Sequence, residues 1–111
     1  MKKTLLLALA LAVIPVGVDA QASDLEETRA RAEQGNARAQ ELLGIRYAAG
    51  TGLPVDNVLA YMWLNLAAAQ GQSAGAPVFR DLTAERMTSE QIAEAQRLSR
   101  EWLEAHPPGG N

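Results

Sequence analysis

The sequence has very few of the side chains that carry catalysis or bind metals. Its 111 residues include no cysteine and a single histidine, His106. Without cysteine the chain cannot form a disulfide, a thiolate nucleophile or a cysteine-ligated metal site. One histidine alone does not supply the ligand cluster that a zinc site needs. We therefore expect neither a metal nor a cofactor, and a fold that is held together by packing alone.

Residues suited to acid–base or nucleophilic catalysis are equally scarce. His106 begins a tail with two prolines and two glycines, where it is poorly placed to activate a nucleophile. Neighbouring carboxylates such as Glu26 with Glu27, or Glu90 with Glu94, fall on helix faces that otherwise look solvated. We expect no catalytic residue and no enzymatic activity. A small carboxylate-dependent hydrolase is the remote alternative.

The start of the chain has the order of charged and apolar residues that is typical of a secretory signal peptide. Lys2 and Lys3 are followed by an almost unbroken apolar run over residues 4–18. This run is shorter than the 20 or so residues that a spanning helix requires. We expect residues 1–20 to be removed, or cleavage after residue 22, which places the protein in the periplasm or outside the cell. Membrane contact is expected only through an uncleaved signal segment.

Removal of this segment leaves an acidic domain. It takes away both lysines and one aspartate, so that eight of the ten basic and twelve of the thirteen acidic residues remain, a formal charge of −4. A surface of this sign repels phosphate backbones. Nucleic acid is therefore not an expected partner.

The rest of the sequence predicts an all-α fold, because helix-forming stretches alternate with glycine and proline. Two pairs, Ser23 with Glu26 and Thr88 with Gln91, have the spacing of a capping box at a helix start. Two more residues, Asn36 and Asp56, are expected to cap the second and third helices. The expected helices are 24–34, 36–49, 57–70, a short one that starts at Pro77, and 88–105, with a flexible tail over 106–111.

The third predicted helix, 57–70, is apolar on nearly all sides. Its only polar residues are Asn57, Asn65 and Gln70. A helix of this kind must be covered by other helices or by a second molecule. A structural homo-oligomer in which this helix pairs two copies is therefore an alternative.

A short internal repeat indicates how the helices are arranged. The segment from Ala32 to Gly35 recurs as Ala68 to Gly71, so that two helix-ending glycines lie 36 residues apart. A period near 36 residues is typical of stacked helix pairs.

The segment between these glycines resembles the Sel1-like repeat family, which is related to tetratricopeptide repeats (TPR). The resemblance rests on small, aromatic and glycine positions that agree in order and spacing with the family pattern: Ala39, Leu43, Gly44, Tyr47, Gly50, Gly52, Asp56, Ala60, Trp63, Ala67 and Gly71. It implies antiparallel helix hairpins of a Sel1/TPR-like α-solenoid fragment over residues 23–105, with one complete repeat over about 36–71 and a C-terminal capping helix. Family members are adaptors, so the resemblance, taken with the signal-peptide pattern, leads us to expect an exported module that binds a protein or peptide partner in the cell envelope.

The family pattern is complete only once. A shift of 36 residues aligns Gly44 with Arg80, so the second copy has lost the pattern. A single hairpin offers a short groove, and we expect the partner along the first two helices and beside the third. The candidate contacts are three charged residues expected to be exposed on the second helix, Arg38, Glu41 and Arg46. Ordinary solvated charge is the alternative interpretation of these three residues.

Overall fold

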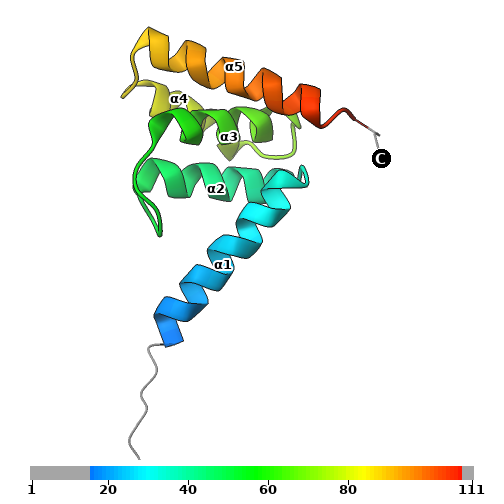
Figure 1. Cartoon of the computed structure of the whole chain (residues 1–111). Coiled ribbons are helices and arrows are strands. Elements are labelled where there is room, and N and C mark those ends of the chain that lie inside the picture. The colour runs from blue at the N-terminus through cyan, green and yellow to red at the C-terminus, as the bar shows by residue number, and fades with distance from the viewer. Residues whose placement is uncertain (1–15, 109–111) are drawn as a thin grey trace, which may run out of the picture.

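Helices make up all the regular secondary structure in the part of the chain that the structure describes. This computed structural model describes residues 16–108, with side chains from residue 22 onward. The helices are α1 (Val16–Glu33), α2 (Ala37–Ala49), α3 (Asn57–Ala69), α4 (Gly75–Ala84) and α5 (Ser89–Ala105) (Figure 1). The prediction of an all-α fold is confirmed. Most of the expected signal peptide, residues 1–15, lies outside the described residues, as does the end of the expected tail, 109–111.

Helix α3 lies at the centre of the bundle. It contacts α2, α4 and α5, and Figure 1 shows α2 and α5 on opposite sides of it. Its buried residues are Ala60, Tyr61, Met62, Trp63, Leu64, Leu66 and Ala67. Other helices of the same chain therefore cover these residues, which is the first of the two kinds of cover expected from the sequence.

The α2–α3 hairpin lies in the segment where the complete repeat is expected, and its two helices pack closely at Gly44. A Cβ atom on Gly44 would lie 2.6 Å from Leu64 Cγ and 3.1 Å from the carbonyl oxygen of Ala60. On the other side of α3, Trp63 meets Trp102 of α5 edge to face, with ring centroids 6.2 Å apart. Helix α5 therefore closes the hydrophobic core, as expected of a capping helix.

Helix α1 extends away from the bundle at a steep angle and packs through its C-terminal half (Figure 1). Thr28 and Ala32 are buried, and Asp24 forms an ion pair with Arg46 of α2. The expected start near Asp24 is wrong, because the helix continues upstream to Val16 and so runs through Ser23 instead of being capped there.

Both expected cleavage positions, after residues 20 and 22, fall inside α1. No helix within residues 16–108 is long and apolar enough to cross a membrane.

Local capping chemistry sets the starts of α2, α3 and α5 as predicted. Asn36 and Asp56 each accept a hydrogen bond from the backbone amide three residues on, at 2.8 and 3.0 Å. Thr88 and Gln91 form the predicted reciprocal capping box. These side chains satisfy amide donors that the first turn of a helix leaves free.

The predicted start of α4 at Pro77 is wrong by two residues. The helix begins at Gly75, because Ser73 Oγ accepts hydrogen bonds from the amides of Gly75 and Ala76 at 3.0 and 3.3 Å. A serine two residues before the helix therefore satisfies the free donors earlier than the proline pattern indicates.

Candidate functional site

The three charged residues predicted to contact a partner do not form one free surface. Arg38 is well exposed, with 72% of its side chain accessible. Arg46 is only 20% accessible and pairs with Asp24 of α1. The expectation that Glu41 is exposed is wrong, because its side chain is only 5% accessible.

Glu41 is buried at the start of α4. Its Oε1 lies 3.5 Å from Arg38 Nη1 and has no hydrogen-bond partner among the described residues. A Cβ atom on Gly75, the first residue of α4, would lie 2.8 Å from Glu41 Oε2. The positive end of the α4 dipole therefore faces this carboxylate. In this position Glu41 is enclosed between α2 and the start of α4 and is not available to a partner.

The family-pattern residues lie within the hairpin and its turns. Ala39, Leu43, Gly44, Ala60, Trp63 and Ala67 are buried. Tyr47 is half-buried against the core, and its carbonyl accepts a hydrogen bond from the Asp56 amide at 3.0 Å. Gly50, Gly52 and Gly71 have φ angles between 70° and 83°, the left-handed region that favours glycine.

An apolar groove lies between α2 and α4. Its cavity volume is about 280 Å³, and it is lined by Ile45, Ala48, Ala49, Leu64, Phe79, Leu82, Thr83 and Arg86. Phe79 and Leu82 are 41% and 48% exposed, and their neighbour Val78 is 57% exposed. The sequence predicted the helix that carries these three residues, but not that they face outward. Their exposure could have been expected, because α4 is short and cannot bury three large apolar side chains against α3.

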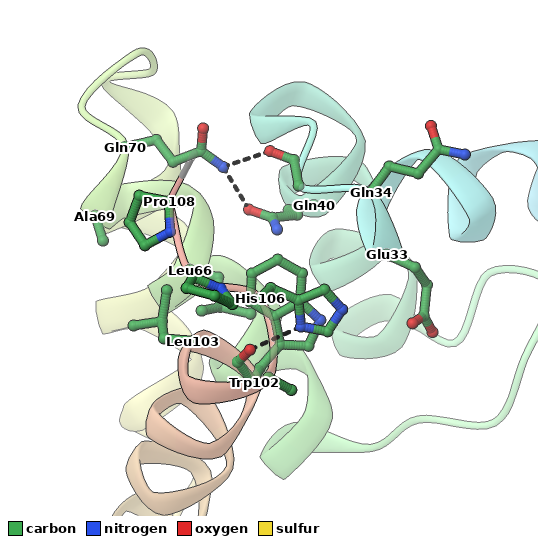
Figure 2. Close-up of a pocket in the computed structure, with 13 residues that line it drawn as sticks. Glu33, Gln34, Gln40, Leu66, Ala69, Gln70, Trp102, Leu103, His106 and Pro108 are labelled. Atoms are coloured by element: carbon green, nitrogen blue, oxygen red, sulfur yellow. Dashed lines mark hydrogen bonds between the residues drawn. The ribbon is translucent and has the colours of Figure 1, made fainter. Parts of the chain in front are cut away.

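A larger cleft, of about 760 Å³, opens at one end of the bundle (Figure 2). It is formed by the α1–α2 turn, the end of α3 and the end of α5 with the residues that follow it. One wall is the His106 ring, which stacks on Trp102 with centroids 3.9 Å apart and planes within 9°. His106 was expected to belong to a flexible tail. The sequence did contain a sign of this stacking: His106 follows Trp102 by four residues, a spacing that places both side chains on one helix face.

The floor of this cleft contains a pair of hydrogen-bonded glutamines. Gln40 is fully buried; its Nε2 donates to the Ala32 carbonyl at 3.2 Å, and its Oε1 accepts from Gln70 Nε2 at 2.9 Å. Gln70 Nε2 also donates to the Gly35 carbonyl at 2.8 Å. The pair thereby ties α3 to the turn between α1 and α2 (Figure 2).

Replacement of Gln40 should loosen this end of the bundle. We expect Gln40→Leu, which removes one buried and one partly buried hydrogen bond, to lower the free energy of unfolding by about 1–3 kcal/mol. Urea denaturation followed by circular dichroism measures the change. Gln72→Leu, in an exposed position beyond Gly71, is the matched control. Equal unfolding midpoints for the two variants would contradict the role given to the glutamine pair.

In each of the two carboxylate pairs considered for catalysis, one member, Glu94 or Glu27, pairs with an arginine of its own helix. Arg97 donates to both Glu94 and Glu101, and the hydrogen bond from Arg97 lowers the pKa of Glu94. A general acid needs a raised pKa instead. Glu27 forms an ion pair with Arg31. Among residues 22–108, no three histidine, cysteine or acidic side chains come together in a way that suits a metal ion.

Comparison with known proteins finds a likeness to a solved structure. No protein-family model and no curated protein matches the chain. The match is the crystal structure of a protective antigen present in uropathogenic Escherichia coli strains, which displays a Sel1-like repeat (SLR) fold. It superposes on this chain with a TM-score of 0.73 at 30% sequence identity. The likeness covers 79% of this chain and 19% of the antigen. The chain therefore spans about a fifth of the antigen's length.

Proposed function

The chain is a Sel1-like repeat protein, and from this premise we propose that it is an exported module that binds another protein in the cell envelope. The observation that carries the proposal is the apolar groove between α2 and α4. Exposed apolar side chains that gather around a hollow are typical of protein-binding surfaces. The groove also lies on the complete repeat and on the helix that follows it.

The shape of the groove favours an amphipathic helix as the bound segment. The groove has one wall from α2, with Ile45 and Ala48, and one from α4, with Phe79 and Leu82. An amphipathic helix fits such a groove by inserting side chains spaced three or four residues apart. Arg86 at the same groove offers a charge to an acidic residue of the bound helix.

The packed part of α1 lies downstream of both expected cleavage positions. Ala22, Ser23 and Asp24 are exposed, whereas Thr28 and Ala32 are buried. Cleavage after residue 20 or 22 therefore shortens α1 but leaves the Asp24–Arg46 ion pair and these two buried residues in place. Mass spectrometry of the protein from the envelope fraction of its host tests this: we expect a new N-terminus at residue 21 or 23, and an intact Met1 would contradict it.

The groove itself is tested by photo-crosslinking. We expect a photoreactive residue at position 79 to crosslink one partner in the native envelope, because this side chain lies at the groove and is exposed. The same residue at position 100, on the charged outer face of α5, is the matched control and should give no such product. Phe79→Asp should abolish capture of that partner while the circular dichroism spectrum stays unchanged.

The homo-oligomer stays an alternative, now through the groove and not through α3. A second copy placing its own Phe79 in the groove would form a symmetric dimer. Sedimentation at low and high protein concentration separates the two functions. A dimer that Phe79→Asp disrupts, with no other crosslinked protein, would replace the adaptor proposal.

A further inference from the structure

The cleft at the end of the bundle has a negative electrostatic character. The last residues of three helices line it: Glu33 of α1, Ala69 of α3 and Ala105 of α5. The C-terminal end of a helix carries a partial negative charge, so these three ends act in the same direction, while the first turn of α2, which reaches the cleft through Gln40, opposes them in part. Glu33 adds a full negative charge, and neither arginine nor lysine is among the described residues that line the cleft.

Most hydrogen-bond donors of the cleft are already used within the protein. Gln40 Nε2 donates to the Ala32 carbonyl, and Gln70 Nε2 to Gly35 and Gln40. The Trp102 indole N–H is buried and makes no hydrogen bond with a described residue. The exposed amide of Gln34 can both donate and accept.

The acceptors, by contrast, are available. His106 Nδ1 donates to the Trp102 carbonyl at 2.7 Å, because a carbonyl oxygen can only accept. In the tautomer with the proton on Nδ1, the lone pair is on Nε2. Gln70 Oε1 makes no hydrogen bond with a described residue, and the exposed Glu33 carboxylate has no ion pair with one. A ligand that fits this set is rich in donors and carries a positive charge.

The remaining walls suit a flat group on an aliphatic stem. The exposed His106 ring, backed by Trp102, presents an aromatic face, and Leu66 and Leu103 provide apolar surface beside it (Figure 2). A guanidinium group is planar, carries five N–H donors and no acceptor, and stacks on aromatic rings. The ammonium group of lysine lacks the planar face and the fork of donors.

We propose that this cleft binds an arginine side chain of the partner protein, with the guanidinium group stacked on His106 and paired with Glu33. The inference rests on the proposed protein-binding function and adds the chemistry of a second contact point. The net negative charge of the domain is complementary to a partner segment that contains arginine.

The test uses the two indole N–H signals of the purified protein as reporters. Trp102 lines the cleft and Trp63 is buried in the core, so ¹H–¹⁵N spectra contain a reporter and an internal reference. We expect N-acetyl-arginine amide to shift the Trp102 signal in a saturable way and to leave Trp63 almost unmoved. The neutral isostere N-acetyl-citrulline amide should bind at least about tenfold more weakly, because charge-assisted hydrogen bonds are lost.

Two isosteric variants locate the charge that matters. Glu33→Gln should weaken arginine binding several-fold, whereas Glu90→Gln, on an exposed carboxylate at the far end of α5, should not change it. Equal binding of citrulline, a non-saturable shift, or equal affinity of the two variants would overturn the inference. Crosslinking from position 79 is an independent measurement, so the proposed function stands if only the arginine site fails.

Discussion

The variant Gly44→Leu is expected to lose cooperative folding. Leu64 Cγ lies 2.6 Å from the position that a Cβ atom on residue 44 would occupy, and Leu64 is fully buried. The Ala60 carbonyl oxygen, at 3.1 Å, belongs to the backbone of α3 and cannot rotate away. Overpacking typically costs about 1–3 kcal/mol, and a four-carbon side chain at this crossing should reach or exceed the upper end. Thermal unfolding followed by circular dichroism shows whether a sharp transition survives.

The control for this variant adds the same side chain elsewhere on α2. Ala49 is exposed near the end of the helix, so Ala49→Leu should leave the unfolding midpoint nearly unchanged. Gly44→Ala is also informative, because alanine gains up to about 1 kcal/mol of helix propensity over glycine and so partly offsets the clash. A midpoint for Gly44→Leu equal to that of Ala49→Leu would show that α2 and α3 separate without loss of stability, contrary to the packing described.

The parts of the fold that sequence reasoning predicted well depend on chemistry within a few residues. Asn36, Asp56 and the Thr88–Gln91 pair each bond to backbone amides three positions away, so their effect is visible in the sequence. The start of α1 was misjudged because Ser23 is equally able to cap a helix or to lie within one. Propensity does not decide between these two states when the upstream residues are also good helix formers.

The candidate sites were harder to predict because they depend on contacts between distant segments. Glu41 has the charge and the helix position of a solvent-facing residue, but the first residue of α4, 34 positions later, covers it. The cleft combines the ends of α1, α3 and α5, which no local pattern brings together. The Gln40–Gln70 pair does lie within the repeat that the sequence resembled, yet its hydrogen bonds depend on how the two helix ends meet.

The variant Trp63→Ala is expected to remove much of the stability of the domain. Trp63 is 5% exposed, and its ring fills the space between α3 and α5 while meeting Trp102 edge to face at 6.2 Å. Truncation of a large buried aromatic costs about 3–5 kcal/mol. A domain of this size has only about 5–13 kcal/mol of total stability. Guanidinium denaturation followed by circular dichroism should therefore show an early midpoint or no folded baseline.

Two companion variants separate the volume of Trp63 from its edge-to-face contact. Trp63→Phe keeps an apolar ring in the cavity and should cost clearly less than Trp63→Ala, since most of the packing survives. Trp102→Ala removes the partner ring from a half-exposed position, so its cost should also be smaller. If Trp102→Ala proved the more destabilising of the two alanine variants, the centre of the core would have to lie at the interface with α5 and not within the α2–α3 hairpin.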